Sequence, residues 1–141
     1  MDLTDVFESA RLASRALNLV DDDTINSVLM ALADETEKRI PFILEENAKD
    51  LARMDKSNPV YDRLLLTKER IEGIAGDIRN VAKLNSPLGI ILDDRVLANG
   101  LKIKKVTVPF GVIGIIYEAR PNVSFDVFSL CFKSGSACVL K

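Results

Sequence analysis

Residues 108–141 follow an order that only a few folds accommodate: an apolar strand, a polar loop, an apolar helix, a glycine and a second apolar strand. Residues 110–116 are continuously apolar, which is typical of a strand covered on both faces. The helix expected over residues 123–134 is apolar on nearly every side, which predicts that it is buried. Ser134-Gly-Ser136 is typical of a helix C-cap, and residues 137–140 are the second strand. This order predicts a βαβ unit, which places ligands at the carboxyl ends of its parallel strands.

Four amphipathic helices are expected before this unit, over about residues 2–84. Apolar residues recur in them every three or four positions, as on one buried face of a helix. A turn at residues 21–24 caps the second helix, Pro41 starts the third, and Thr67 caps the fourth. The four predicted faces are Val6, Ala10, Ala13, Leu17 and Val20; Ile25, Val28, Leu29, Leu32 and Ala33; Leu44, Ala48 and Leu51; and Ile71, Ile74, Ala75, Ile78, Val81 and Ala82. Faces of this kind pack a core and are not chemical sites.

Residues 86–108 connect the helices to the βαβ unit and are rich in turn-forming residues. Asn99-Gly100 is a strong signal for a tight turn. Residues 101–108 after it are expected to form a strand with residues 90–92 as a partner, while Asp93 and Asp94 are expected in a loop. A small β-rich arm is therefore predicted between the helices and the βαβ unit.

Composition narrows the class of protein. The 141 residues suffice for one ordinary domain or for the front part of a larger one. No apolar run approaches the roughly 20 residues that span a bilayer, and the N-terminus lacks a basic secretory stretch, so we expect a cytoplasmic protein with no membrane partner. A pI near 5.2 with few aromatic residues argues against nucleic acid as a partner. The absence of histidine excludes Ser-His and Cys-His pairs and histidine metal ligands, and no metal site is predicted.

Charge is uneven along the chain. Residues 101–141 carry six basic side chains and two acidic ones, whereas the preceding residues are acidic in sum. A basic end suits a phosphate-bearing ligand. The lysines at 102, 104 and 105 suit a solvated strand equally well.

The loop at residues 117–122 gathers four polar side chains between the apolar strand and the apolar helix. The N-terminus of a buried helix presents free N–H groups and a partial positive charge, which makes it a ready anion site. Asn122 is either an amide donor at that site or a plain N-cap. Arg120 either clamps a carboxylate or phosphate or pairs with Glu118 or Asp126. Lys141 either meets a ligand at the carboxyl end of the second strand or is solvated.

Cys131 in the helix and Cys138 in the second strand fit neither a C-x-x-C pair nor a disulfide framework. Burial among apolar side chains is expected to raise the pKa of both thiols. Neither cysteine is therefore expected to act as a nucleophile.

Two runs of residues closely resemble the gamma-glutamyl phosphate reductases, a branch of the aldehyde dehydrogenase superfamily. They are Val108-Pro-Phe-Gly-Val-Ile-Gly-Ile-Ile-Tyr-Glu-Ala-Arg-Pro-Asn-Val123 and Lys133-Ser-Gly-Ser-Ala-Cys-Val-Leu-Lys141. The P-x-G-V-x-G-x-I opening is shared across the superfamily, whereas the Glu-Ala-Arg-Pro-Asn-Val continuation is particular to this branch. Upstream, Glu46-Asn-Ala-Lys-Asp-Leu51, Asp62-Arg-Leu-Leu-Leu66 and Ile78-Arg-Asn-Val-Ala82 resemble the branch too. The resemblance covers essentially the whole chain.

This resemblance implies an α/β fold in which residues 1–141 are the N-terminal part of an NADP-binding domain. Residues 2–84 would supply helices, residues 86–108 an oligomerisation-type arm and residues 110–141 the βαβ unit. Because the family is longer, its catalytic domain is expected to be absent from this chain. The family reduces L-glutamyl 5-phosphate with NADPH to L-glutamate 5-semialdehyde and phosphate in proline biosynthesis, and a homo-oligomer is expected.

By the same resemblance, a cysteine beyond Lys141 displaces phosphate to form a thioester, and hydride transfer from NADPH follows. Asn122 is the candidate donor to the oxyanion, and Arg120 competes for that place. Ile116, Tyr117, Glu118 and Lys141 are candidates to bind NADP(H), with Lys141 at the adenosine ribose or its 2′-phosphate. The chain alone is expected to be inactive because it lacks the activated thiol.

Two other functions stay open at this point. Another aldehyde or acyl-phosphate oxidoreductase of the superfamily would share residues 111–116 but should lack residues 118–123 as written. A non-catalytic helical interaction module would need a self-sufficient core and would be indifferent to NADPH. Residues 137–141 argue against the module, because an apolar terminal strand would leave an exposed edge that favours aggregation.

Overall fold

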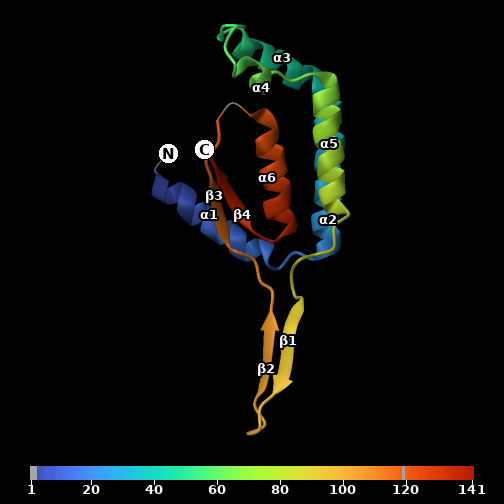
Figure 1. Cartoon of the computed structure of the whole chain (residues 1–141), viewed down its shortest axis with the longest axis vertical. Helices are drawn as coiled ribbons and strands as arrows, with labels where there is room; N and C mark the ends of the chain where they lie inside the picture. The colour runs from blue at the N-terminus through green and yellow to red at the C-terminus, as the bar shows by residue number, and fades with distance from the viewer. Residues whose placement is uncertain (1–2, 119) are drawn as a thin grey trace.

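The computed structural model describes residues 3–118 and 120–141. Its elements are α1 (Leu3–Leu17), α2 (Asp22–Lys38), α3 (Ile40–Leu51), α4 (Tyr61–Leu64), α5 (Lys68–Ala82), β1 (Ile91–Val96), β2 (Lys102–Val106), β3 (Val112–Ile115), α6 (Pro121–Lys133) and β4 (Ala137–Leu140). The start expected for the first helix, residue 2, lies outside the described residues. Figure 1 shows the helices gathered with β3 and β4, while β1 and β2 project away from them. Among the described residues, no helix combines the length and apolar character needed to cross a membrane.

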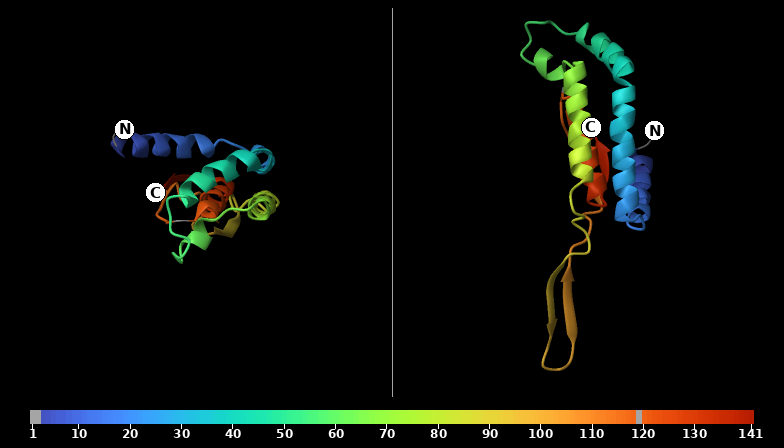
Figure 2. Two further views of the ribbon diagram at one scale, coloured as in Figure 1. Left: turned by 90° about the horizontal axis from the view of Figure 1, so that it is seen from above. Right: turned by 90° about the vertical axis from the view of Figure 1, so that its right-hand side faces the viewer.

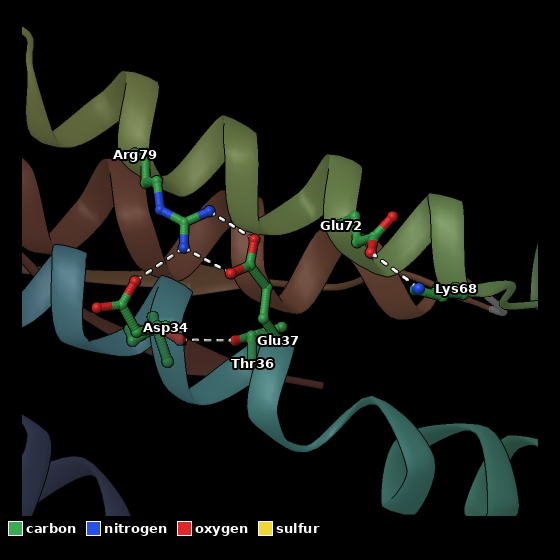
Figure 3. A network of polar contacts seen from close by, with 7 residues as sticks. Asp34, Thr36, Glu37, Lys68, Glu72 and Arg79 are labelled. Carbon is green, nitrogen blue, oxygen red and sulfur yellow. Dashed lines mark hydrogen bonds and ion pairs between the residues drawn. The ribbon is translucent and has the colours of Figure 1, made fainter.

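The core lies where α2, α5 and α6 meet (Figure 1). Ile25, Leu29 and Ala33 of α2 are buried with Ile74, Ala75, Ile78 and Ala82 of α5, and Phe125, Phe128 and Phe132 of α6 pack against them. Arg79 also ties α5 to α2, because its guanidinium contacts Glu37 at 2.6 Å and Asp34 at 2.8 Å (Figure 3). Since α6 follows directly on the loop at residues 117–122, this packing sets where the loop lies relative to α5.

The predicted helix starts are confirmed. The Asp21 carboxylate accepts a hydrogen bond from the Thr24 N–H at 2.7 Å, and the Thr67 hydroxyl accepts one from the Arg70 N–H at 3.2 Å. Each of them satisfies a backbone donor that the first turn of a helix leaves without a partner. Pro41 lies in the first turn of α3, where its missing N–H costs nothing.

The predicted helix faces are correct at most positions and wrong at three. Ala13, Val28 and Ala48 are exposed, and Ser14 and Asn47 are buried in place of the two alanines. Spacings of three and of four residues both fit one helical face, and positions 13 and 14 follow Ala10 at these two spacings, as positions 47 and 48 follow Leu44. The spacing alone therefore does not settle which of the two neighbours faces inward. The buried polar residues are tolerated because each forms hydrogen bonds; the Ser14 hydroxyl donates to the Arg11 carbonyl at 2.9 Å.

β3 and β4 pair in parallel, with Val112 opposite Ala137 and Ile115 opposite Leu140, and α6 connects them. This is the strand–helix–strand order expected from the sequence. The pairing continues beyond the strands, because the Lys141 N–H donates to the Ile115 carbonyl at 2.9 Å. The carboxyl ends of both strands therefore lie side by side, next to the loop that leads into α6.

Gly135 ends α6 in the predicted way. It follows the C-cap residue Ser134 with a φ of 66°, in the left-handed region that glycine adopts without strain. A Cβ at this position would also lie 2.8 Å from Leu88 Cδ1. The glycine is therefore required both by the backbone conformation and by the neighbouring segment.

Two expectations about burial in this unit are wrong for the described residues. β3 is shorter than residues 110–116, its residues alternate between exposed and half-buried, and Ile116 just after it is 85% exposed. α6 is not buried on every side either, since Leu130 is 55% exposed. In the described part of the chain β4 is the one strand that pairs with β3, and α1 and α6 pack on β4 more than on β3. One face of β3 consequently has nothing to pack against there.

β1 and β2 form an antiparallel hairpin that extends away from the helices (Figures 1 and 2). The Asn99-Gly100 turn is confirmed, with Gly100 at a φ of 85°. β1 is longer than residues 90–92 and includes both Asp93 and Asp94, so the predicted loop is wrong. These carboxylates are tolerated in a strand because Lys104 lies opposite Asp94 and forms an ion pair with it at 3.3 Å.

Lys133 is a buried cation that the sequence pattern does not reveal. Its side chain is 4% exposed, and Nζ donates to Asp22 Oδ1 at 2.8 Å and to Asn26 Oδ1 at 2.6 Å. These bonds tie the last turn of α6 to the first two turns of α2. The hydrogen bond from Lys133 is also the largest cause that holds the pKa of Asp22 below its usual range.

Replacing Lys133 by methionine is expected to destabilise the fold by about 1–3 kcal/mol, because two acceptors lose a charged donor. Urea unfolding measures this loss, with Lys102→Met on the exposed hairpin as the control. Because folding lowers the pKa of Asp22, the stability it contributes is present at neutral pH and is lost as the pH falls below about 4. The difference between the native protein and Lys133→Met should therefore shrink in acid, and a constant difference would contradict the assignment.

Candidate functional site

A cleft of about 400 Å³ opens between α5 and the N-terminal end of α6, and the segment that joins α4 to α5 closes one side. Its polar lining comes from three places: Asp62, Arg63 and Arg70 on α4 and the start of α5, Asp77 further along α5, and Arg120, Asn122 and Asp126 at the start of α6. Both catalytic candidates from the sequence, Asn122 and Arg120, therefore lie in one cleft. Segments about sixty residues apart in the chain meet there because α5 packs on α6.

The α4–α5 wall of the cleft is held by a buried amide. Asn47 on α3 is 6% exposed; its Nδ2 donates to the Leu64 carbonyl at 2.9 Å, and its Oδ1 accepts from the Leu66 N–H at 2.9 Å. These two bonds satisfy the backbone on both sides of Leu65, where the chain turns from α4 into α5. The wall is therefore fixed in one conformation.

Arg70 reinforces the same wall from the side of the cleft. Its guanidinium donates to the carbonyls of Asp62 and Leu65 at 2.7 Å each and contacts Asp62 Oδ1 at 3.0 Å. Three acceptors thus occupy Arg70, and the Asp62 carboxylate already has a cation as partner. Both groups therefore hold the wall in shape.

At the other side of the cleft, Arg120 is the N-cap residue of α6 and Pro121 takes the first helical position. The interpretation of Asn122 as a plain N-cap is wrong, because proline prefers the first helical position and moves the start of the helix ahead of Asn122. The Asn122 amide instead donates to Asp126 Oδ2 at 3.1 Å, one turn further along α6. This bond orients the amide, and its second hydrogen has no partner among the described residues.

Three charged groups face the cleft without a partner among the residues that the structure describes: Arg63, Arg120 and Asp77. The alternative pairing of Arg120 with Glu118 or Asp126 is not formed. Sequence reasoning missed Arg63 and Asp77. One signal was present, since Arg70, Gly73 and Asp77 recur at helical spacing on the face of α5 away from its apolar stripe.

The four predicted cofactor residues lie at the carboxyl edge of β3 and β4. The Tyr117 N–H donates to the Lys141 carbonyl at 2.9 Å, which places residues 116–118 beside Lys141. The Tyr117 hydroxyl lies 2.5 Å from Ser124 Oγ on α6, and the side chains of Ile116, Glu118 and Lys141 are exposed. None of these four residues lines the cleft. The loop before α6 thus separates two neighbouring regions, the strand edge and the cleft.

The two cysteines are as inert as expected. Desolvation is the largest cause that raises the pKa of both the Cys131 and the Cys138 thiol. A raised pKa keeps a thiol protonated at neutral pH and lowers its reactivity. Neither residue lines the cleft.

The fold and the cleft together define a mixed α/β chain with a polar site at the start of the crossover helix of a parallel βαβ unit, a usual place for ligands. No family model matches the chain. The gamma-glutamyl phosphate reductase of Bacteroides thetaiotaomicron is 66% identical over 140 residues, which are 99% of this chain and 34% of the relative. That of Bacteroides fragilis is 60% identical over 141 residues, covering 100% of this chain and 34% of the relative.

Solved structures agree with the sequence comparison. The gamma-glutamyl phosphate reductase of Thermotoga maritima superposes with a TM-score of 0.93 at 32% identity over 99% of this chain and 34% of its own. That of Saccharomyces cerevisiae gives 0.87 at 31% identity, over 95% of this chain and 35% of its own. The chain spans about a third of the length of the relatives it matches. In sequence and fold it is similar to an N-terminal portion of the gamma-glutamyl phosphate reductases, and the resemblance predicted from its motifs is confirmed.

Proposed function

We propose that this chain is part of an enzyme that reduces L-glutamyl 5-phosphate with NADPH and yields L-glutamate 5-semialdehyde and phosphate. The observation that carries this proposal is the 66% identity, over 99% of the chain, to a protein named gamma-glutamyl phosphate reductase. That name states the substrate and the kind of reaction. The cleft also supports the proposal, because Arg120 and Asn122 line it at the N-terminus of α6, where an anion such as phosphate binds favourably. Arg120 forms no ion pair with any residue that the structure describes.

At the acyl end of the substrate, Asn122 and Arg120 have separate tasks in this proposal. When a thiolate attacks the acyl carbon, negative charge develops on the acyl oxygen, and the bond to phosphate then breaks. One hydrogen of the Asn122 amide is held by Asp126, so the other can donate to that oxygen. Arg120 takes the departing phosphate. The thiolate comes from the rest of the enzyme, because burial raises the pKa of Cys131 and Cys138.

The strand edge suits a dinucleotide. Lys141 offers an exposed cation for the adenosine ribose or its 2′-phosphate, and the exposed side chain of Ile116 offers apolar surface to a ring. The Tyr117 hydroxyl is engaged by Ser124 and its N–H by the Lys141 carbonyl, so the exposed side chain of the neighbouring Glu118 is the part that remains open to a ligand. Bound at this edge, NADPH would supply the hydride that reduces the thioester.

The other expectations about the whole protein stay predictions. The hairpin of β1 and β2 exposes Ile91, Leu92, Val96 and Leu101, which fits an arm that assembles a homo-oligomer. The division into helices, arm and βαβ unit at residues 2–84, 86–108 and 110–141 stays a prediction, because it concerns the domains of a longer protein. A cytoplasmic location follows from the proposed biosynthetic role.

The test is phosphate-dependent reduction of NADP⁺ by the complete gene product, supplied with glutamate 5-semialdehyde, beside the 141-residue chain. A chimera that joins this chain to the remainder of the Bacteroides thetaiotaomicron relative serves equally well. Turnover by the long form alone is expected. Turnover by the 141-residue chain would overturn the exclusion of Cys131 and Cys138. No turnover by a folded long form would reject the substrate assignment.

A further inference from the structure

Two cleft-lining residues of opposite charge, Arg63 on α4 and Asp77 on α5, form no ion pair with each other or with any other residue that the structure describes. No ion pair joins them, so their charged atoms lie more than 4.0 Å apart. The adjacent charges are already engaged, since Asp62 is paired with Arg70 and Asp126 accepts from Asn122.

The backbone segments that carry Arg63 and Asp77 are both fixed by contacts with the rest of the fold. Arg63 lies in the segment that Asn47 and Arg70 fasten through backbone hydrogen bonds on both sides of Leu65. Asp77 lies on α5, which is fixed by the core. Gly73 also lines the cleft, and a Cβ at this position would meet no atom within 4 Å. The cleft is therefore open at this point of its α5 wall.

A ligand that satisfies both groups must carry an anion for Arg63 and a cation for Asp77. An α-amino acid does so, since its ammonium and carboxylate share one carbon atom. In L-glutamyl 5-phosphate two methylene groups separate this head from the acyl phosphate. The acyl phosphate is the end already assigned to Asn122 and Arg120 on the opposite wall of the same cleft.

We propose that Arg63 binds the α-carboxylate and Asp77 the α-ammonium of the substrate, so that these two residues select an amino acid among acyl phosphates and aldehydes. This inference rests on the proposed function and adds the residues that recognise the head of the substrate. Neither residue takes part in the chemical step. Both contribute affinity and orientation, because a charge-assisted hydrogen bond is formed at each end of the head group.

The experiment compares three aldehydes as substrates of the complete gene product in the phosphate-dependent direction. Glutamate 5-semialdehyde carries both head groups, 5-oxopentanoate lacks the ammonium, and 4-aminobutanal lacks the carboxylate. Asp77→Asn is expected to lower kcat/KM for glutamate 5-semialdehyde about 10- to 100-fold and to leave kcat/KM for 5-oxopentanoate nearly unchanged. Arg63→Gln is expected to lower kcat/KM for glutamate 5-semialdehyde by a similar factor and to leave kcat/KM for 4-aminobutanal nearly unchanged. Arg63→Lys, which keeps the charge, should restore part of the loss.

Two exposed charges outside the cleft give matched controls. Glu72→Gln changes a carboxylate on the same helix, where it pairs only with Lys68 (Figure 3), and Arg53→Gln changes an exposed arginine. Neither should alter selectivity among the three aldehydes. Equal losses on all three aldehydes, or no loss, would overturn the inference while the proposed function stands. An inactive but folded native enzyme would instead reject the proposed function, and the inference with it.

Discussion

Replacing Asn122 by alanine is expected to lower kcat of the complete enzyme by about 10²–10³-fold, the usual effect of removing one donor to an oxyanion. The amide faces the cleft from the first turn of α6 and is oriented by its hydrogen bond to Asp126 at 3.1 Å. The residue is exposed and alanine is a strong helix former, so the fold should tolerate the change. Steady-state kinetics should show the loss in kcat, with KM for glutamate 5-semialdehyde little changed.

Arg120→Gln separates the two candidates for this role. If Arg120 binds phosphate, its replacement should raise KM for phosphate in the oxidative direction and leave most of kcat intact. A large loss of kcat in Arg120→Gln, together with a small one in Asn122→Ala, would assign the oxyanion to the arginine instead. Thermal unfolding of both variants shows whether either effect arises from the fold.

Replacing Gly73 by glutamine is expected to stabilise the protein and to inactivate it. Glycine within a helix costs about 0.5–1 kcal/mol relative to good helix formers, and a side chain here would meet no neighbouring atom at Cβ. The added side chain would extend into the cleft between the two walls that we propose to hold the substrate. Displacing the substrate by about 1 Å is enough to lower kcat/KM about 10²-fold. Thermal unfolding and steady-state kinetics on one preparation measure both effects.

Gly76 offers the matched control for this change. It lies on the same helix, a Cβ there also meets nothing within 4 Å, and it does not line the cleft. Gly76→Gln should therefore share the gain in stability and retain activity. If both variants keep full activity, the cleft is not where the substrate binds. If both lose activity equally, the loss reflects α5 as a whole rather than the cleft.

Features that depend on a few neighbouring residues could be predicted from the sequence. Asp21 and Thr67 cap α2 and α5 because a side-chain oxygen reaches a backbone N–H three residues away, whatever the rest of the chain does. Asn99-Gly100 turns the hairpin, and Gly135 ends α6, because glycine adopts a positive φ without strain. The motif at residues 108–123 likewise predicted the similarity to the gamma-glutamyl phosphate reductases.

Features that depend on which elements meet could not be predicted in this way. Residues of β3 alternate between exposed and half-buried, whereas a continuously apolar run predicts burial on both faces. The exposed face could be recognised only from the packing of α1 and α6, which lie on β4 more than on β3. Periodicity alone did not distinguish Ala13 from Ser14, because neighbouring small residues fit one face almost equally well. From the sequence alone, Lys133 would be expected at the surface. Its burial depends on Asp22, which lies 111 positions away in the chain and accepts a hydrogen bond from the Lys133 amine.

The sequence by itself thus determined the order of elements, the caps and turns that bound them, and the candidates Asn122 and Arg120, because each of these depends on local chemistry. Only the tertiary structure decided that these candidates share a cleft with Arg63 and Asp77. The packing of α5 on α6 brings the two pairs together, and the hydrogen bonds of Asn47 hold the α4–α5 segment where it completes the site. Contacts between distant residues arise from burial of apolar area by whole helices, which no short motif encodes.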